Sequence, residues 1–321
     1  MDLLVASGGG HLHELLLLRD RLRPAVGSSH WVTYGTDEAL DRVRGEAVTV
    51  CHHPTSRSLA NAGRNLFLAS RLLRELRPQR VISTGAGVAV PFLGTAARMG
   101  IEAHYVESAA RVDGPSLSGR LLSGVRRVSL HSQHPGWADP RWRYGGSVFD
   151  GFRSRVTSDD TTDRPLRIAI SVGTHTSPFD RLIAAVERVT GDADEVFAQL
   201  GPATTAPASW RTVARLPPDA LARELAAADV VVCHAGVGLL LTSFAGGRPP
   251  VVIARRAAHG EHVDDHQQQI ATASAQRGLS RSVDADRLDR RMLLDQARRT
   301  IELDTAAAPA FALRAGRPVA H

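Results

Sequence analysis

Two glycine-containing turns in the second half of the sequence have the composition of an anion-binding site. The run "SVGTH" ends one apolar strand, and "DVVVCHAGVG" ends another and leads into a helix. Glycine lets the backbone approach a ligand closely, and the free N–H groups at a helix start favour a diphosphate. Any strand-to-helix turn also favours glycine, so each turn alone fits a structural role equally well. The candidate diphosphate-binding residues in these turns are Gly173, Thr174, Gly236 and Gly238.

A second polar cluster lies downstream, in "RAAHGEHVDDHQQQIA". Its helix start carries Asp265, Gln267 and Gln268, whose side chains can form hydrogen bonds with sugar hydroxyls. The stretch also fits a solvated helix start, or a metal site built from its three histidines. Because the histidines lack the His-Glu-x-x-His order of zinc proteases, we expect no metal there.

Short apolar, β-branched runs alternate with segments of helical periodicity, which is typical of parallel sheets covered by helices. In the first half the pattern predicts strands near 3–7, 30–35, 47–51, 80–84, 103–107, 127–132 and 143–148, and helices near 11–22, 37–44, 60–76, 86–99 and 116–124. The polar stretch that follows is typical of a linker, and the pattern then begins again. We predict an α/β protein of two doubly wound domains, 1–152 and 166–321, joined by a linker at 153–165. A ligand is expected in the cleft between them, at the carboxyl ends of the strands.

The composition narrows the class of partner. Of 321 residues, 39 are basic and 33 acidic, for a net charge of +6, and every basic residue other than histidine is arginine. This balance suits an anionic partner, but only 5% of residues are aromatic and no nucleic-acid-binding module is visible, so nucleic acid is not expected. Cys51 and Cys233 are too few for a disulfide framework. With no signal peptide and no apolar span, we expect a cytoplasmic protein.

Both halves contain runs that resemble glycosyltransferase family 28. In the second half these are "LPPDALARELAAADVVVCHAGVG", "GGRPPVVIA", "DHQQQIA" and the start "SVGT…FDRLI", which resemble the catalytic subunit of the dolichol-linked N-acetylglucosamine transferase. The first half resembles the membrane-anchoring subunit of that enzyme in "SGGGHLHELLLL", "VISTGAGVAVPFLGTAARMGI" and "AHYVESAARVDGPSLSGRLL". The motifs keep their order from about residue 3 to 275, so the chain resembles a fusion of the two subunits and, more distantly, the peptidoglycan N-acetylglucosaminyltransferase.

The resemblance implies a GT-B fold, in which two Rossmann-like domains face each other across a cleft. It places a UDP-sugar in the C-terminal domain, with the base near Leu216. The diphosphate would lie against both glycine turns, where His234 and Val237 join the nucleotide-binding residues. Where the family has a glutamate that binds the ribose hydroxyls, this sequence has Thr242, followed by Ser243. Either hydroxyl can make one hydrogen bond, but the bidentate carboxylate contact is lost.

The resemblance places the acceptor in the N-terminal domain. His11 falls on the histidine of the family's Gly-Gly-His motif, whose glycines are Gly9 and Gly10 here. The intrinsic pKa of histidine suits a general base that deprotonates the acceptor hydroxyl, although His11 also fits a residue that only orders the loop. Glu107, in "YVESAARV", is the second candidate base or, alternatively, an ion partner of Arg111, which is itself a candidate acceptor-binding residue.

We therefore predict an inverting glycosyltransferase that moves N-acetylglucosamine or a related hexose from a UDP-sugar to a hydroxyl group. The expected acceptor is a polyprenyl-linked glycan precursor or a small molecule. Backbone N–H groups and a helix dipole would stabilise the leaving UDP without a metal or other cofactor. A UDP-sugar epimerase of the same fold and a non-catalytic binding subunit of a transferase remain alternatives, and the sequence predicts no oligomeric state.

The predicted helix within 61–80 carries leucines, Phe67 and five arginines. An apolar face with a basic margin fits a peripheral membrane helix, and more commonly a core-facing helix with a solvated edge. Because the expected acceptor is polyprenyl-linked, a contact of this helix with the inner face of the cytoplasmic membrane remains an alternative.

Overall fold

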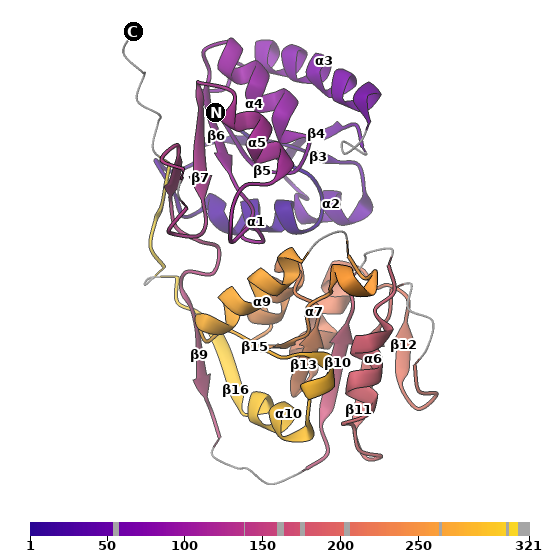
Figure 1. Ribbon diagram of the computed structural model, residues 1–321. Coiled ribbons are helices and arrows are strands. Elements are labelled where there is room, and N and C mark those ends of the chain that lie inside the picture. Colours follow the sequence, from indigo (N-terminus) through magenta and orange to yellow (C-terminus); the bar gives the residue numbers. More distant parts are fainter. Residues whose placement is uncertain are drawn as a thin grey trace. The chain divides into compact units, whose positions relative to one another are not determined.

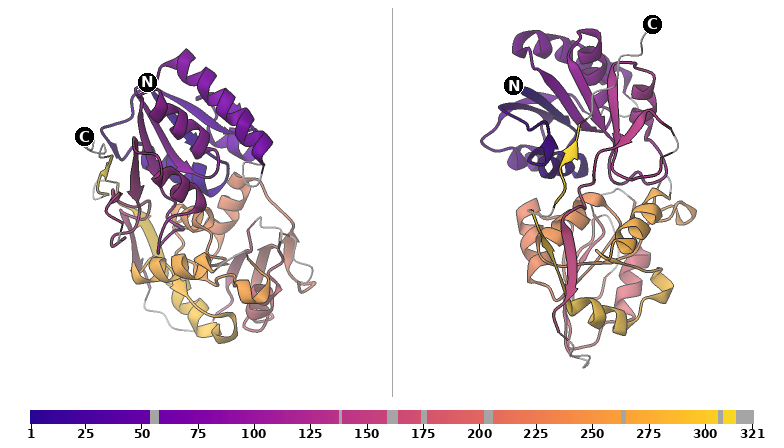
Figure 2. Two further views of the ribbon diagram at one scale, coloured as in Figure 1. Left: turned by 45° about the horizontal axis from the view of Figure 1, so that its top comes forward. Right: turned by 90° about the vertical axis from the view of Figure 1, so that its left-hand side faces the viewer.

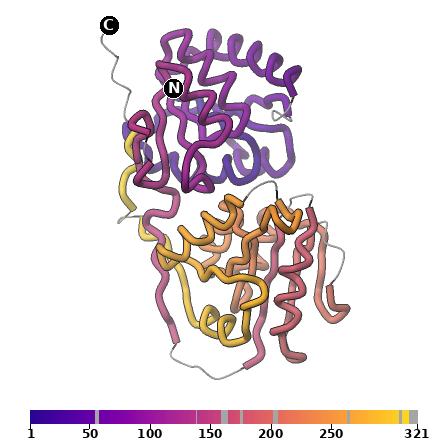
Figure 3. Tube along the Cα trace, viewed as in Figure 1, coloured from indigo at the N-terminus to yellow at the C-terminus, as the bar shows by residue number. Residues whose placement is uncertain are grey.

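The computed structural model describes residues 1–53, 58–137, 139–158, 164–173, 177–201, 206–262, 265–305 and 308–313 of the chain. The chain divides into two compact units (Figure 1). Unit 1 contains Met1–Asp150 and Pro309–His321, and unit 2 contains Gly151–Ala308. The trace in Figure 3 follows the indigo N-terminal part of the chain into unit 1 and the orange part through unit 2.

Unit 1 is built on a seven-stranded sheet of order β4-β3-β1-β5-β6-β7-β8, in which every neighbouring pair is parallel. The strands are β1 (Asp2–Ala6), β3 (Ser29–Tyr34), β4 (Ala47–Cys51), β5 (Arg80–Gly85), β6 (Glu102–Val106), β7 (Val128–Ser132) and β8 (Trp142–Tyr144). The helices are α1 (Gly10–Arg19), α2 (Asp37–Arg42), α3 (Leu59–Leu76), α4 (Ala89–Arg98) and α5 (Leu117–Ser123). Figure 1 shows α3, α4 and α5 on one face of the sheet and α1 and α2 on the other. Since both faces are covered, β1 is buried at all five positions.

Unit 2 repeats this architecture with a six-stranded parallel sheet of order β12-β11-β10-β13-β14-β15. The strands are β10 (Arg167–Ser171), β11 (Glu195–Gln199), β12 (Arg211–Val213), β13 (Val230–Cys233), β14 (Val251–Val252) and β15 (Arg281–Ser282). The helices are α6 (Asp180–Glu187), α7 (Pro218–Ala227), α8 (Val237–Ala245), α9 (His266–Gln276) and α10 (Arg290–Ala297), with short 3-10 turns at Ala257–His259 and Ala285–Arg287. The predicted fold class, α/β with two Rossmann-like parallel sheets, is confirmed.

The residues around the unit boundary differ from the expected linker. Strand β9 (Phe152–Val156) pairs antiparallel with β16 (Arg299–Leu303), and the two strands lie side by side in unit 2 (Figure 2). Phe152 is nearly buried, with its ring 5.3 Å from that of Phe244 on α8. The first part of the stretch expected to be a linker is therefore a strand, because one aromatic side chain anchors an otherwise polar segment.

The end of the chain also differs from the expected C-terminal domain, which ran to residue 321. Strand β17 (Phe311–Ala312) pairs in parallel with β2 (Leu22–Arg23) of unit 1. The Phe311 side chain is fully buried, and a Cβ at Gly145 would lie only 2.6 Å from its ring. Phe311 thus fills a space in unit 1 that a glycine leaves open.

Candidate functional site

The two glycine turns of unit 2 meet on one histidine ring. Gly173 follows β10 with φ +79°, and Gly236 follows β13 at the start of α8. A Cβ at either position would overlap the imidazole of His234. The ring therefore packs against both turns, and the carboxyl ends of β10 and β13 are joined there as parallel neighbours. Thr174, the other residue predicted for the first turn, lies outside the described residues.

The start of α8 has backbone donors that no side-chain cap satisfies. Gly236 is the N-cap residue and makes no side-chain hydrogen bond to the helix, and its carbonyl accepts the N–H groups of Leu239 and Leu240. The first N–H groups of a helix, here those of Val237 and Gly238, have no partner within the helix, and they carry the positive end of its dipole. This end of α8 has the electrostatics that a diphosphate requires.

The residues predicted to bind the ribose and the base have other hydrogen bonds. The Thr242 hydroxyl donates to the Gly238 carbonyl of its own helix at 2.8 Å, which leaves its oxygen as an acceptor only. Ser243 is fully buried, and its hydroxyl donates to the Arg248 carbonyl at 2.6 Å, so it is not accessible to a ribose. The Leu216 N–H donates to Gln199 Oε1 at 2.9 Å, so this donor is already used within unit 2.

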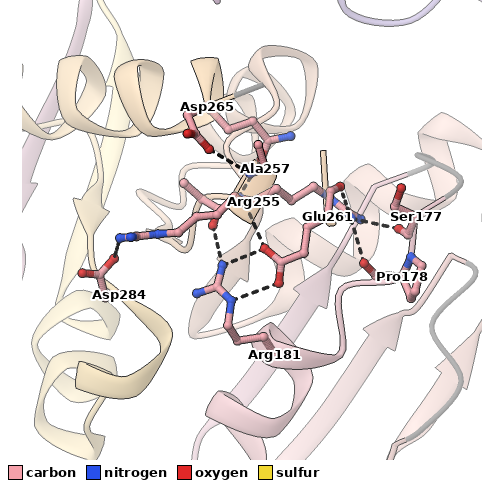
Figure 4. A network of polar contacts seen from close by, with 11 residues as sticks. Ser177, Pro178, Arg181, Arg255, Ala257, Glu261, Asp265 and Asp284 are labelled. Carbon is pink, nitrogen blue, oxygen red and sulfur yellow. Dashed lines mark hydrogen bonds and ion pairs between the residues drawn. The ribbon is translucent and has the colours of Figure 1, made fainter. Parts of the chain in front are cut away.

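Two polar side chains at the start of α9 already accept hydrogen bonds from backbone N–H groups of the same unit; Figure 4 shows the one at Asp265. Asp265 is exposed, and its Oδ1 accepts the Ala257 N–H at 2.8 Å. Gln267 is 4% exposed, and its Oε1 accepts the backbone N–H of Arg255 at 3.1 Å. Gln268 is half-buried, which leaves it and Asp265 as the accessible members of the predicted sugar-binding group.

His11 of unit 1 is held in a defined tautomer. Its Nδ1 lies 2.8 Å from the Thr84 carbonyl oxygen, which can only accept a hydrogen bond, so Nδ1 carries the proton and Nε2 the lone pair. Burial lowers the pKa of His11, the Thr84 hydrogen bond opposes this, and the charge of Arg111 lowers it further. Gly85, with φ +107°, leaves room for the ring, because a Cβ there would lie 3.2 Å from it. Near neutral pH, His11 is thus an unprotonated imidazole, the form that a general base needs.

Gly9 and Gly10 form the turn that brings His11 to the helix start. Gly9 adopts φ +68°, a region that favours glycine, and α1 begins at Gly10 without a side-chain cap. Both glycines are half-buried. Arg111, the other predicted acceptor-binding residue, is also half-buried, in the loop after β6.

Glu107, the second candidate base, is saturated with hydrogen bonds. Its Oε1 accepts from the Tyr105 hydroxyl at 3.0 Å and the Ser108 N–H at 3.2 Å, and its Oε2 accepts from the N–H and hydroxyl of Ser116 at 2.8 and 2.9 Å. The side chain is 1% exposed, and burial raises its pKa while these hydrogen bonds oppose the rise. Ser116 caps α5, so Glu107 ties the end of β6 to the start of that helix.

Glu14 on α1 is a buried carboxyl that the sequence reasoning missed. Its Oε1 accepts from the Ser108 hydroxyl at 2.6 Å, and its Oε2 accepts from the Ala109 N–H at 2.9 Å and from Gln133 Nε2 at 2.6 Å. Burial raises its pKa to about 7, more than these hydrogen bonds lower it. The signal was present, since residues three apart share a helix face and Glu14 lies three residues after His11.

A metal site is not found among the described residues, in which no three or more His, Cys, Asp or Glu side chains are grouped to hold an ion. His262 and His266 instead contact each other edge to face, with ring centroids 4.6 Å apart. Within the same described ranges, none of the helices has the length and hydropathy to cross a bilayer.

Known proteins similar to this chain point to one family. Residues 167–311 match the glycosyltransferase family 28 C-terminal domain. The UDP-N-acetylglucosamine–N-acetylmuramyl-(pentapeptide) pyrophosphoryl-undecaprenol N-acetylglucosamine transferase of Clavibacter michiganensis subsp. michiganensis is 28% identical, over 80% of this chain and 77% of its own length. The human UDP-N-acetylglucosamine transferase subunit ALG14 is 30% identical, over 46% of this chain and 81% of its own length.

Among solved structures, MurG of Acinetobacter baumannii superposes with a TM-score of 0.57 at 18% identity, over 92% of this chain and 93% of that one. At this identity the likeness speaks for the fold, and it confirms the GT-B fold class. The matched C-terminal domain and the relatives of both halves together show that the chain belongs to glycosyltransferase family 28.

Proposed function

We propose that the chain is a UDP-sugar-dependent hexosyltransferase that moves N-acetylglucosamine, or a related hexose, to a hydroxyl group of a polyprenyl-linked glycan precursor. The names of the Clavibacter and human relatives support a UDP-N-acetylglucosamine donor, and the Clavibacter name supports a lipid-linked acceptor. In this proposal unit 2 binds the donor and unit 1 binds the acceptor.

The observation that carries the proposal is the pair of glycine turns packed on His234 beside the uncapped start of α8. A diphosphate bound there would be stabilised by the N–H groups of Val237 and Gly238 and by the helix dipole. The negative charge on the leaving UDP grows in the transition state, so these fixed donors favour the reaction step itself, and no metal is required.

In the proposed reaction, His11 acts as the general base. Its Nε2 takes the proton of the acceptor hydroxyl while that oxygen attacks the anomeric carbon. The bond from this carbon to the diphosphate oxygen breaks with its electron pair on UDP, and attack from the opposite face inverts the anomeric configuration. Glu107 remains the second candidate, but its four hydrogen bonds would first have to be exchanged.

The test has a binding stage and a turnover stage. Calorimetric titration of the full chain with UDP, GDP and TDP should give a clear preference for UDP, and binding of none of them would refute the proposal. UDP-N-acetylglucosamine is then supplied with a polyprenyl-diphosphate-linked sugar or a soluble glycoside, and UDP release and the product anomer are measured. Release of an epimerised sugar without acceptor would identify an epimerase. Binding of UDP without any turnover of the UDP-sugar would identify a non-catalytic subunit.

A contact with the cytoplasmic membrane face is the part of the proposal that concerns α3. One face of this helix is buried, as expected for a core-facing helix. On its other side, Leu59, Leu66 and Phe67 are 93%, 46% and 73% exposed. The exposed Arg71 follows Phe67 by one helical turn. Vesicles containing anionic lipid should bind the wild-type chain more tightly than Phe67→Ser, and equal binding of both would exclude this helix.

A further inference from the structure

Arg255 is a fully buried cation in unit 2, just after β14. Its Nη1 donates to the carbonyls of Ser177, Pro178 and Glu261 at 2.8, 3.1 and 3.2 Å, as Figure 4 shows, and its Nη2 donates to that of Val172 at 2.9 Å. Its Nε finds no acceptor among the residues that the structure describes. Burying a charge that is bound only by neutral carbonyls costs folding free energy, so a stability role alone does not account for Arg255 at this position.

The four carbonyls belong to two separate segments. Val172, Ser177 and Pro178 belong to the segment after β10, and Glu261 belongs to the segment between β14 and α9. The Val172 carbonyl is part of the peptide bond to Gly173, so this hydrogen bond acts directly on the first glycine turn. One guanidinium group therefore fixes that turn against the segment that leads to the polar start of α9.

The charges of the described residues around Arg255 do not balance. Glu261 is the carboxylate whose charge acts on Arg255, but its oxygens accept from Arg181 Nε and Nη2 at 2.9 and 2.8 Å. The neighbouring Arg256 forms its own ion pair with Asp284. Among the described residues, the buried Arg255 and the half-buried Arg181 thus share one carboxylate, which leaves positive charge in excess beside the Val172–Gly173 peptide.

The ring of Phe179 holds the two cations in place. The guanidinium carbon of Arg255 lies 4.7 Å from the ring centroid and that of Arg181 lies 5.4 Å away. Such stacking stabilises a cation, and more so when water is excluded. Phe179 is fully buried, so the position of the charge is fixed by packing as well as by hydrogen bonds.

We propose that Arg255 is a positioning residue of the donor site, which orders the Gly173 turn and supplies a buried positive charge that favours the diphosphate. This inference rests on the proposed function, in which unit 2 binds a nucleoside diphosphate. A charge in a poorly solvated position acts more strongly than one in water, so it distinguishes ligands by their own charge.

The test compares UDP with UMP, which carries less negative charge, by calorimetric titration of the full chain. Arg255→Gln should weaken UDP binding at least tenfold and UMP binding clearly less, whereas Arg255→Lys, which keeps the charge, should lose less UDP affinity than Arg255→Gln. The control is Arg188→Gln in the same unit, because this exposed arginine also donates to two backbone carbonyls, those of Ala285 and Leu288, at 2.8 and 3.2 Å. It should bind both nucleotides as the wild type does.

Equal UDP affinity in the Arg255 and Arg188 variants, or equal losses for UDP and UMP, would overturn the inference while leaving the proposed function standing. Wild-type protein that binds neither nucleotide would overturn both. If Arg255→Gln does not fold, Phe179→Leu removes the stacked ring and leaves the charge in a looser position. It should weaken UDP severalfold and UMP less, and unchanged UDP affinity would again overturn the inference.

Discussion

Replacing Glu14 by glutamine should stabilise unit 1 relative to the wild type, by an amount that increases as the pH rises. Its carboxyl has a pKa of about 7 in the folded protein against its usual 4.5. Because each tenfold change in proton affinity corresponds to about 1.4 kcal/mol, ionising the buried group costs the folded state roughly 3 kcal/mol. The stability that protonated Glu14 contributes is complete below pH 4.5 and is lost as the pH rises through 7.

Glutamine can keep the three hydrogen-bond partners of Glu14 without ionising, with the direction of the Ser108 hydrogen bond reversed. Its oxygen can accept from the Ala109 N–H and from Gln133, as Glu14 Oε2 does, and its amide nitrogen can donate to the Ser108 hydroxyl. The stability difference between Glu14→Gln and the wild type should therefore be small near pH 4.5. By pH 8 it should have moved by about 3 kcal/mol in favour of the variant.

The measurement is urea unfolding between pH 4.5 and 8, followed by tryptophan fluorescence. Three of the four tryptophans, Trp31, Trp137 and Trp142, are in unit 1, so a Trp210→Phe background makes the signal specific for that unit. Glu75→Gln, at an exposed position of α3, is the control and should leave the pH dependence of the wild type unchanged.

The comparison between variants is needed because other buried groups titrate in the opposite sense. Burial lowers the pKa of His11, His104 and His131, so their contributions grow as the pH rises toward 6.5. These contributions are common to wild type and variant and cancel in the difference. A difference that stays constant within about 1 kcal/mol from pH 4.5 to 8 would refute the assignment of a raised pKa to Glu14.

Three further outcomes are expected. His11→Ala should lower kcat by about 10² to 10⁴-fold with UDP affinity unchanged, and wild-type turnover in the variant would make His11 structural. Gly236→Ala forces a Cβ against His234 and should weaken UDP binding by about tenfold to a hundredfold. Gly191→Ala, whose Cβ would make only an ordinary 3.9 Å contact with Asp194 Oδ2, should leave UDP binding unchanged; equal binding by both variants would show that the turn tolerates a side chain. Phe311→Ala should cost unit 1 about 3 to 5 kcal/mol in urea unfolding, and a loss below 1 kcal/mol would mean that the last strand is dispensable.

Most of the parallel core was predictable from sequence because local patterns report it directly. The run "DLLVA" is apolar at nearly every position, as a strand covered on both faces must be, and it forms β1. The two glycine turns were likewise predictable, because glycine follows an apolar strand in each, and the structure places both against His234. These features depend on residues that are close together in the sequence, so one sequence is enough to predict them.

The missed features depend on contacts between distant residues. Strand β9 is held by β16, which lies about 150 residues later. Arg153, Ser154 and Arg155 make the middle of β9 polar, so its sequence does not show a strand pattern. Ser243 looked like a ribose ligand by position, but its hydroxyl is bound to Arg248 beyond the end of its helix. The buried partners of Glu14 come from the loops after β6 and β7, and no local pattern links them to α1.

The return of the C-terminal residues to unit 1 sets a condition on any attempt to express the units separately. A fragment that stops at Asp150 would leave Leu22 without its strand partner and the space beside Gly145 empty. Joining residues 309–313 to that fragment through a short flexible linker, or adding them as a peptide, should restore the missing strand. The first unit of this chain is therefore encoded by two stretches of the gene, and a single cut after Asp150 separates β2 from its partner β17.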